Sequence, residues 1–438
     1  MDRTWHKPLP AADLLLRGGR VVDPRSGIDA VQDVLVKRGR IAETGSAITA
    51  SKSAREVDVT GMLVLPGFVD LHAHLRAPGR EDEEDVASGT LAAAAGGYVR
   101  VFAMANTDPA IDTAAGLRGM ADVARAEAVV PLGFYGAVTR GLKGEQLTEM
   151  AELAEAGAVA FSDDGRPLAT AVLVRRALQY AKITGRVVAV HGQDDSLFAG
   201  GQMHEGPVSA RLGLAGIPSL CESLDVARAL DMAAYEAAPL HVHHVSAAAS
   251  LEALSRAKST GLKVTAEATP HHLTMTDEAV VSLDSNVKMN PPLREEDDRQ
   301  ALVKALKSGL VDCVATDHAP HAPMSKDVPF EEAAFGTTGL ETAFAVLYTD
   351  LVKRRALDLG TLVTRMSQAP AAIAGGEPPA IRPGALADLC VVDPRATWTV
   401  TVEGFKSKSA NSAFLGRRLT GRVKLTVAAG RVAWEDDA

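Results

Sequence analysis

One local pattern occurs eight times between residues 63 and 321: a short β-branched run, a polar or glycine-containing turn, and a longer stretch rich in Ala and Leu. The short runs are typical of buried strands, and the longer stretches have helical spacing. The eight runs are Leu63–His74, Tyr98–Asn106, Val129–Thr139, Val159–Gly165, Arg186–Asp194, Pro239–Ser246, Lys263–His272 and Cys313–His321. Eight parallel strands that alternate with helices close into a barrel, so the pattern predicts an α/β fold of the (β/α)8 TIM type.

An open, doubly wound sheet would show the same alternation of strands and helices. When such a sheet binds a dinucleotide, a Gly-x-Gly-x-x-Gly turn follows its first strand. No such turn follows the first run here. The sequence therefore favours the closed barrel, although the alternation supports the α/β class more strongly than it supports closure at eight strands.

The two ends of the chain differ from this middle region. Segments such as DLLLRGGRVVDPRSG near the start and RRLTGRVKLTVAAGRVAWE near the end are typical of short strands joined by glycine turns. Neither end is long enough to bury a core alone. We therefore predict one small β domain made of residues 1–65 and 377–438, with a barrel domain of residues 66–376 inserted between them.

Charge and cysteine content exclude several classes of protein. The chain has 46 Lys and Arg against 55 Asp and Glu, a formal net charge of −9, and no basic block. Nucleic acids and anionic membranes both require concentrated positive charge, so we expect neither as a partner. Three widely spaced cysteines cannot form a disulfide framework, and the first ten residues hold no apolar signal region. We therefore expect a cytoplasmic protein.

The first predicted barrel strand ends in the segment Asp70-Leu71-His72-Ala73-His74-Leu75-Arg76. Alternation along a strand places His72, His74 and Arg76 on the same side, and the carboxyl ends of barrel strands form the mouth that holds active sites. Two imidazoles two residues apart can bind one divalent cation. Taken alone, the motif is equally compatible with a polar, half-buried pair.

Further histidines end two other predicted strands: His191 ends one, and His241, His243 and His244 end another. In a barrel these strand ends converge, and a cluster of imidazoles with carboxylates suits a first-row metal, Zn²⁺ by ligand type. Strand alternation does not decide which of the three is a ligand, because His241 and His243 share one face and His244 takes the other. The position just before the turn at Ser246 favours His244.

Carboxylates end the fourth and eighth predicted strands. Asp163 and Asp164 precede Gly165, and Asp317 lies in the segment CVATDHAPH. A carboxylate can bridge two metal ions, although Asp-Asp-Gly is also a common turn. A bound metal ion lowers the pKa of its water ligand to about 7, and attack on an amide carbonyl then needs a proton acceptor nearby. Asp317 is the candidate general base and then acid, or simply a ligand.

Seven motifs carry a resemblance to a known family. They are, in order, PGFVDLHAHLRAPG, MANTDP, FSDDG, TAEATPHHL, NVKMNPPLR, ATDHAPH and FGTTGLET. Over nearly the whole chain they resemble the dihydroorotase family, in the bacterial type I branch of the amidohydrolase superfamily. The resemblance implies interconversion of N-carbamoyl-L-aspartate and L-dihydroorotate in pyrimidine (UMP) biosynthesis, at a site with one or two zinc ions in a (β/α)8 barrel with a flanking β domain.

The resemblance also implies roles for particular residues. The metal ligands would be His72 and His74 for one ion, His191 and His244 for the other, Asp164 as the bridge, and Asp317, which would also shuttle the proton. Hydantoinases and many other relatives use a carboxylated Lys as the bridge, and the fourth strand of this chain has none. Two departures from the family pattern are Ala105, where Pro is common, and Gln193, where an acidic residue is common.

The substrate contacts that the resemblance implies are His74, Arg76, Asn106, Asn290, His321 and the backbone of Phe335 and Gly336. The planar fork of Arg76 matches a carboxylate, although a salt bridge to the acidic run Glu81–Asp85 is the alternative. We expect that run to begin a helix and His318–Phe335 to form a mobile lid.

Two alternatives remain at this point. The nearest is another cyclic-amide hydrolase, a hydantoinase or allantoinase, which would carry a Lys at the fourth strand. Another is an inactive, metal-free scaffold that supports aspartate transcarbamoylase, which should have lost several ligands. We also predict a homodimer and name aspartate transcarbamoylase as a candidate partner of the active enzyme.

Overall fold

The computed structural model describes residues 3–49 and 54–436, and parallel strands at its centre form two sheets. One sheet has the order β6-β7-β8, and the other has the order β14-β13-β12-β9. The strands are β6 (Phe68–Ala73), β7 (Tyr98–Ala103), β8 (Leu132–Phe134), β9 (Val188–Val190), β12 (Leu240–Val242), β13 (Val264–Ala268) and β14 (Cys313–Val314). Each lies within one of the eight predicted runs.

Single residues join the two sheets. Phe161 forms parallel bridges to Gly136 on one side and to Val188 on the other, and Ala73 forms a parallel bridge to His318. These bridges complete the ring, which confirms the predicted barrel class. The fourth predicted strand therefore contributes one bridging residue and not a regular strand, because the polar turn that begins at Asp163 follows almost at once.

The first predicted run, Leu63–His74, contains two strands that belong to different sheets. Strand β5 (Leu63–Pro66) pairs with β1 (Leu14–Asp23) and β15 (Leu389–Thr399), whereas β6 begins the barrel. Gly67 separates them, and a Cβ atom there would lie only 2.1 Å from Val99 Cγ1. The prediction of one continuous strand was wrong, since hydrophobicity alone does not show where the chain changes sheets.

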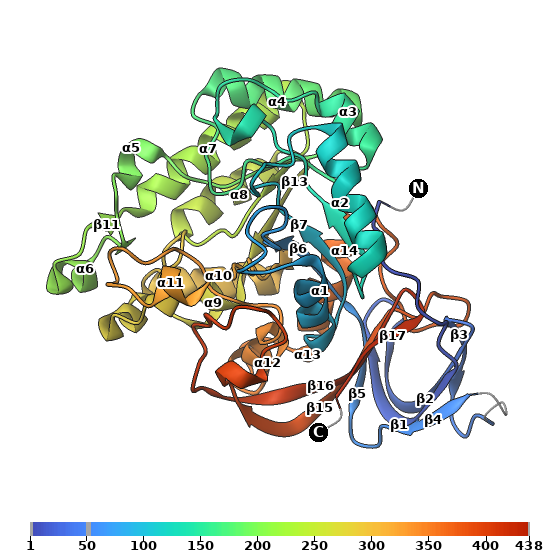
Figure 1. Cartoon of the computed structure of the whole chain (residues 1–438). Helices are drawn as coiled ribbons and strands as arrows, with labels where there is room; N and C mark the ends of the chain where they lie inside the picture. The colour runs from blue at the N-terminus through green and yellow to red at the C-terminus, as the bar shows by residue number, and fades with distance from the viewer. Residues whose placement is uncertain (1–2, 50–53, 437–438) are drawn as a thin grey trace.

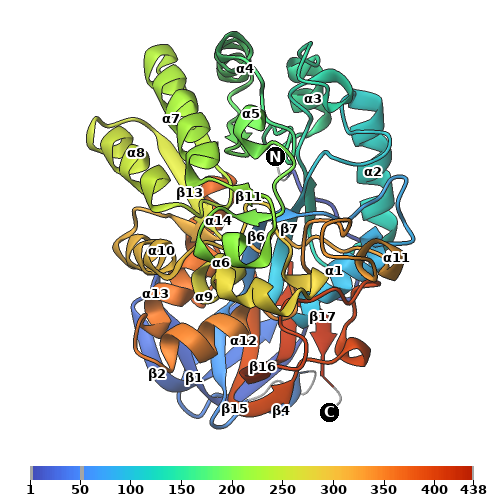
Figure 2. The ribbon, with the colours of Figure 1, turned by 90° about the vertical axis from the view of Figure 1, so that its left-hand side faces the viewer.

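Helices surround the barrel in both ribbon views (Figures 1 and 2). They are α1 (Val86–Ala95), α2 (Ala114–Glu127), α3 (Met150–Ala156), α4 (Ala171–Thr184), α5 (Asp195–Phe198), α6 (Pro207–Leu212), α7 (Ser219–Glu236), α8 (Ala248–Ser259), α9 (Pro270–Thr274), α10 (Glu296–Ser308), α11 (Pro323–Lys326), α12 (Ala343–Leu347), α13 (Leu359–Val363) and α14 (Ala369–Ile373). Local signals set their ends: the Thr170 side chain caps α4, and Gly185 ends it in the left-handed conformation.

Strands from both ends of the chain pair in a separate sheet of eight strands, seen below the barrel in Figure 1. Its order is β17-β16-β15-β5-β1-β2-β3, and β4 pairs with β1. The remaining strands are β2 (Ile28–Lys37), β3 (Arg40–Gly45), β4 (Arg55–Asp58), β16 (Arg418–Ala428) and β17 (Arg431–Glu435), and a small pair elsewhere joins β10 (Met203–His204) to β11 (Gly216–Ile217). The domain boundaries at residues 65 and 377 stay predictions.

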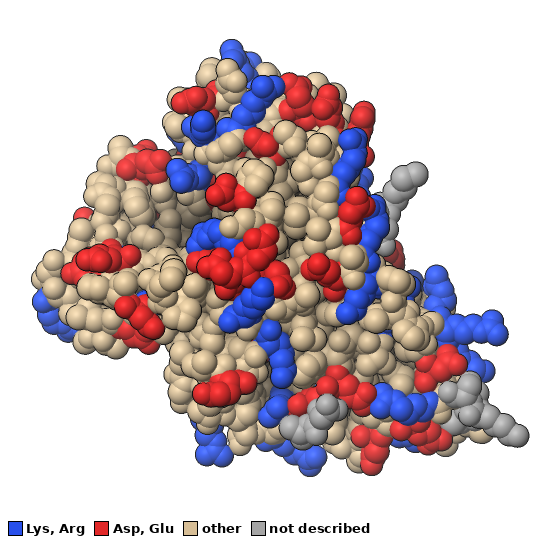
Figure 3. All heavy atoms as spheres, viewed as in Figure 1, with Lys and Arg blue, Asp and Glu red and all other residues tan. Residues whose placement is uncertain are grey.

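The surface of the molecule carries both positive and negative side chains, as the composition predicts. On the face shown in Figure 3, Lys and Arg lie among Asp and Glu. Within the described residues, no helix is both long and apolar enough to cross a membrane.

Candidate metal centre

Six side chains from five strand ends meet at the carboxyl end of the barrel. They are His72 and His74 from β6, Asp164 after the bridging residue Phe161, His191 after β9, His244 after β12, and Asp317 after β14. Two sets of three donors, His72–Asp164–His244 and His72–His74–Asp317, each have ligand atoms within 4.8 Å of one another. The barrel therefore brings together all six predicted ligands, because His191 contacts members of the first set.

The two carboxylate oxygens of Asp164 face different histidine pairs. Asp164 Oδ2 lies 3.4 Å from His72 Nε2 and 3.5 Å from His74 Nε2. Asp164 Oδ1 lies 3.4 Å from His244 Nε2 and 3.7 Å from His191 Nδ1. This is the arrangement expected of a carboxylate between two cation positions.

Asp317 lies on the His72 and His74 side of the centre. Its Oδ1 atom is 3.0 Å from His74 Nε2 and 3.5 Å from His72 Nε2. Both His72 and His74 are buried, so these contacts lie in a largely dry environment. Asp317 can therefore act on the same cation position as the two β6 histidines.

Several residues of the site depart from regular strand geometry, and these departures set the direction of their side chains. Arg76, His244 and Asp317 have φ angles of 58°, 27° and 48°, in the left-handed region that non-glycine residues seldom adopt. Because His244 leaves the strand conformation, its side chain does not follow the alternation of His241 and His243. Backbone strain of this kind costs about 1–3 kcal/mol per residue and concentrates at functional sites.

Hydrogen bonds at the far side of each ring fit the histidines for metal binding. His72 Nδ1 donates to Glu267 Oε1 (2.8 Å), His74 Nδ1 donates to Asn106 Oδ1 (2.9 Å), and His191 Nε2 donates to Gln193 Oε1 (3.1 Å). When these rings are neutral, the other nitrogen of each carries the lone pair that can bind a metal. For His191 this is Nδ1, which lies 2.9 Å from His244 Nε2 and 3.7 Å from Asp164 Oδ1.

The centre itself consists of acceptor atoms that face one another. His72 Nε2 and Asp164 Oδ1 are buried without a hydrogen-bond partner among the described residues. Lone pairs and carboxylate oxygens repel one another in a dry site unless a cation lies between them. The residues present therefore fit a metal ion, and imidazole with carboxylate is a donor set that suits zinc.

Electrostatics keep both carboxylates ionised. Burial alone would raise the pKa of Asp164, but His72, His191 and His244 hold it well below its usual value. Burial would likewise raise the pKa of Asp317, but His72 and His74 lower it below its usual value. Burial lowers the pKa of His72, but Asp164 and Asp317 outweigh this effect and raise it well above its usual value. Either protons on the histidines or a bound cation can therefore balance the two carboxylates.

Glu267, which sequence reasoning missed, joins three histidines beneath the centre. This fully buried carboxylate on β13 accepts hydrogen bonds from His72 Nδ1 (2.8 Å), His241 Nε2 (2.9 Å) and His243 Nδ1 (3.0 Å). Thus His241 and His243 lie in this network and not among the six converging side chains. The only signal in the sequence is a Glu within the small and apolar run TAEAT.

Two more buried carboxylates hold the loops that carry site residues. Asp163 accepts from the backbone N–H groups of Val138 (2.7 Å) and Thr139 (3.0 Å), and burial raises its pKa to about 6. Glu222 accepts from the N–H groups of Ser246 (3.1 Å) and Ala247 (3.0 Å), just after His244. The first Asp of Asp-Asp-Gly is therefore structural, and the second points into the centre.

A cleft of about 940 Å³ opens beside the centre, and Arg76, Asn106 and Asp164 line it. The Asn106 side chain links two of the converging residues, since it also donates to the backbone oxygen of Asp164 (3.2 Å). The contact between Asn106 and His74 is therefore made even though Ala105 stands where Pro is common in the family. Gln193, the other departure from the family pattern, accepts from Asn290 Nδ2 (2.8 Å) as well as from His191.

The other predicted substrate contacts lie around Arg76. Its Nη2 atom is 3.3 Å from His321 Nε2, and that ring nitrogen is 2.8 Å from the backbone oxygen of Phe335. Gly336 lies against the same ring, since a Cβ atom there would be 3.2 Å from His321 Nε2. These neighbours make one wall, and their roles toward substrate stay predictions.

The acidic run does more than begin a helix. Asp85 caps α1 as expected. However, Glu83 Oε2 also lies 3.4 Å from Arg76 Nε and 2.5 Å from Arg80 Nη2. The salt bridge between Arg76 and the acidic run is therefore present. It involves Nε of Arg76 and not the two terminal nitrogens.

Hydrogen bonds from two lysines, one within the segment and one outside it, tie down His318–Phe335, which was predicted to be a lid. Lys326 Nζ donates to the backbone oxygens of Ser285 and Ala334 (both 2.7 Å), and Lys288 Nζ donates to that of Phe330 (2.8 Å). Mobility of this segment stays a prediction.

A barrel with histidines and carboxylates at its mouth is suited to metal-assisted hydrolysis, and comparison with known proteins places the chain among hydrolases that act on cyclic amides. The whole chain is similar to the L-hydantoinase of Arthrobacter aurescens, with a TM-score of 0.87 and 26% identity over 97% of this chain and 96% of that one. It shares the fold of the dihydropyrimidinase of Brevibacillus agri, with a TM-score of 0.82, 24% identity and coverage of 96% and 94%.

Sequence comparison narrows the class. The model of the family described as "Dihydro-orotase-like" matches residues 61–251. The chain is 46% identical over 423 residues to the dihydroorotase of Geobacter metallireducens, covering 97% of this chain and all of the relative. It is 45% identical to the dihydroorotase of Anaeromyxobacter dehalogenans, covering 97% and 98%. The chain belongs to the dihydroorotase family.

The contacts of Glu267 lead to a first prediction. Glu267→Gln should weaken zinc binding about 10- to 100-fold, because an amide replaces one of the two oxygens that orient His72 and its neighbours. Competition with a chromophoric chelator measures the affinity. Glu341→Gln is the matched control, since Glu341 also accepts backbone hydrogen bonds, from Lys406 and Ser407, but lies outside the centre. Equal zinc affinity in both variants would contradict the role of Glu267.

Proposed function

We propose that this chain is a zinc-dependent dihydroorotase that interconverts N-carbamoyl-L-aspartate and L-dihydroorotate in de novo pyrimidine biosynthesis. The observation that carries the proposal is identity of about 45% with proteins named dihydroorotase over essentially their whole length. The site supports it, since six side chains suited to metal binding converge beside a cleft that contains Arg76.

The alternatives predict features that differ from those of this chain. A hydantoinase or allantoinase would have a Lys at the position of Asp164, and its resemblance here is structural, at 26% identity for the L-hydantoinase. An inactive scaffold for aspartate transcarbamoylase would have lost ligands, whereas all six positions hold residues able to bind a metal.

Zinc, when bound, would lower the pKa of a water molecule to about 7 and polarise the substrate's amide carbonyl. The ionised carboxylate of Asp317 would accept a proton from the attacking water and pass it to the departing ring nitrogen. In ring closure the same carboxylate would take the proton from the carbamoyl nitrogen. Its position 3.0 Å from His74 Nε2 would place it beside an amide held at the proposed metal site.

Arg76 would hold the substrate carboxylate. Its Nε atom donates to the backbone oxygen of Pro320 (2.9 Å), and its Nη2 atom contacts His321 Nε2 (3.3 Å), so the guanidinium is already fixed. The remaining N–H groups of its two terminal nitrogens would contact the carboxylate. Asn106, Asn290, His321 and the backbone at Phe335 and Gly336 complete the proposed pocket. A cytoplasmic location, a homodimer and association with aspartate transcarbamoylase are further parts of the proposal that rest on cysteine content and family resemblance.

The direct test is metal analysis together with an assay in both directions. We expect the purified protein to bind about one to two equivalents of zinc, to lose activity when a chelator removes it, and to regain activity when zinc is restored. Activity on hydantoin or allantoin, with none on dihydroorotate, would overturn the proposal.

A second variant isolates the proton shuttle. Asp317→Asn should lower kcat at least about 100-fold, because an amide cannot accept the proton, while much of the bound zinc remains. Asp33→Asn is a control for the loss of a buried carboxylate, since Asp33 pairs with Arg17 far from the centre. A wild-type rate in Asp317→Asn would refute the shuttle.

A third variant tests the carboxylate contact. Arg76→Lys should raise the KM for dihydroorotate about tenfold, since a point charge cannot replace a bidentate fork. Arg80→Lys is the control, because Arg80 pairs with the same Glu83. An unchanged KM in Arg76→Lys, or equal increases in both variants, would show that Arg76 acts only through its salt bridge.

A further inference from the structure

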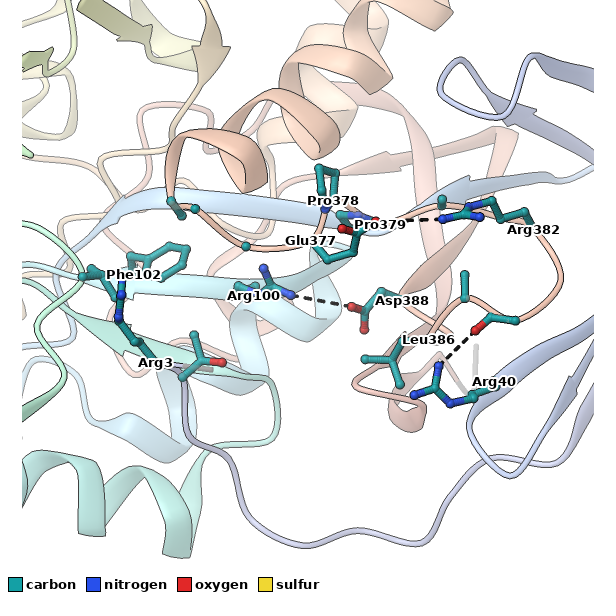
Figure 4. A pocket seen from close by; sticks show the side chains of 18 residues that line it. Arg3, Arg40, Arg100, Phe102, Glu377, Pro378, Pro379, Arg382, Leu386 and Asp388 are labelled. Carbon is teal, nitrogen blue, oxygen red and sulfur yellow. Dashed lines mark hydrogen bonds and ion pairs between the residues drawn. The ribbon is translucent and has the colours of Figure 1, made fainter. Parts of the chain in front are cut away.

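A second pocket, of about 630 Å³, has a lining that shares no residue with the metal centre. Figure 4 shows it from close by. Arg100 lies near the start of β7, whereas the metal centre lies beyond the ends of the barrel strands. The segment that leads from α14 to β15 forms another wall, and Arg40 at the start of β3 reaches it from the β sheet. None of the residues assigned to the reaction lines this pocket.

Positive charge is in excess in this pocket. Four arginines line it: Arg3, Arg40, Arg100 and Arg382. The carboxylates of the lining are Glu377 and Asp388, so two positive charges are not balanced within it. This excess is notable in a chain whose net charge is −9.

Arg100 is the innermost of these cations, and only 9% of its surface is exposed. Its Nε atom is buried without a hydrogen-bond partner among the described residues. Its ion pair with Asp388, from Nη2 to Oδ2, spans 3.9 Å, which is too long for a hydrogen bond. The other oxygen of Asp388 accepts from the backbone N–H of Ala429 (2.6 Å), so this carboxylate is shared.

The backbone makes room for this guanidinium. A Cβ atom at Gly376 would lie 2.3 Å from Arg100 Nη1. A buried guanidinium with unmade hydrogen bonds carries a desolvation cost of several kcal/mol unless another group completes them. An anionic ligand in the pocket would supply that group.

The other arginines are also weakly paired. Arg382 Nη2 lies 4.0 Å from Glu377 Oε1, and the Arg382 side chain is 56% exposed at the rim. Arg40 Nη1 donates to the backbone oxygen of Gly384 (3.0 Å), which leaves its charge uncompensated by that contact. In Figure 4, Arg100 points toward Asp388, and Arg40 and Arg382 lie farther along the pocket.

We propose that this arginine pocket binds a small phosphorylated metabolite at a site separate from the metal centre. A phosphate monoester carries a charge of about −1.5 to −2, which matches the excess of two, and guanidinium forks bind phosphate oxygens in pairs. Phe102, Pro378 and Leu386 provide apolar walls for the rest of the ligand. The volume lies in the usual range of about 300–1,000 Å³ for small-molecule sites.

The test is isothermal titration of the zinc-loaded protein with ribose 5-phosphate, with ribose as the phosphate-free control. We expect a Kd below about 1 mM for ribose 5-phosphate and no binding of ribose. Arg382→Ala and Arg100→Met should each weaken binding about tenfold or more. Arg211→Ala is the matched control, since Arg211 is 57% exposed and pairs with Glu278 away from the pocket.

The variants separate the pocket from the metal centre. If Arg100→Met does not fold, Arg382→Ala at the exposed rim still decides the question. Absence of binding to the wild-type protein would overturn the proposal. So would unchanged binding in Arg382→Ala, or loss of binding in Arg76→Lys alone, which would place the phosphate in the reaction cleft.

Discussion

The position of the Asp164 carboxylate is the constraint on which the site depends. Its two oxygens face two different histidine pairs, so a small movement of its loop would break both sets of contacts at once. That loop follows the least regular part of the barrel, where Phe161 alone bridges the neighbouring strands. Asp163 compensates by accepting backbone hydrogen bonds from Val138 and Thr139, which replace the missing strand pairing. Of these two adjacent carboxylates, Asp163 therefore holds the loop in place, and Asp164 points into the centre.

The same division recurs at the other strand ends. His244 and Asp317 both have strained backbone angles, and each lies next to a buried hydrogen-bond anchor. Glu222 holds the chain just after His244, and Asp70 accepts from the backbone N–H of Thr316 (2.9 Å), one residue before Asp317. Strain persists only where surrounding contacts determine the conformation, and these carboxylates supply those contacts. The predicted ligands are therefore positioned by acidic residues that lie outside the six converging side chains.

Sequence periodicity was sufficient to predict the barrel and the convergence of histidines at its mouth, because both follow from the alternation of short strands and helices. It failed where partners are distant in the chain. The separation of β5 from β6 depends on pairing with β15, more than 300 residues away. Strand parity could not place His244, since its backbone leaves the strand region. Glu267 was missed because three histidines from two other strands define its role, and no local spacing records such contacts.

The two ends of the barrel have opposite electrostatic requirements. At the mouth, ionised Asp164 and Asp317 face imidazole lone pairs, an arrangement that only a cation or bound protons can stabilise. At the base, Arg100 has incomplete hydrogen bonding beside a shared Asp388, an arrangement that an anion would stabilise. A net charge of −9 describes neither region, because a total does not record where the charges lie, and buried charges interact more strongly with their neighbours than exposed charges do. Local pairing, more than total charge, therefore decides which ions this barrel can bind at each end.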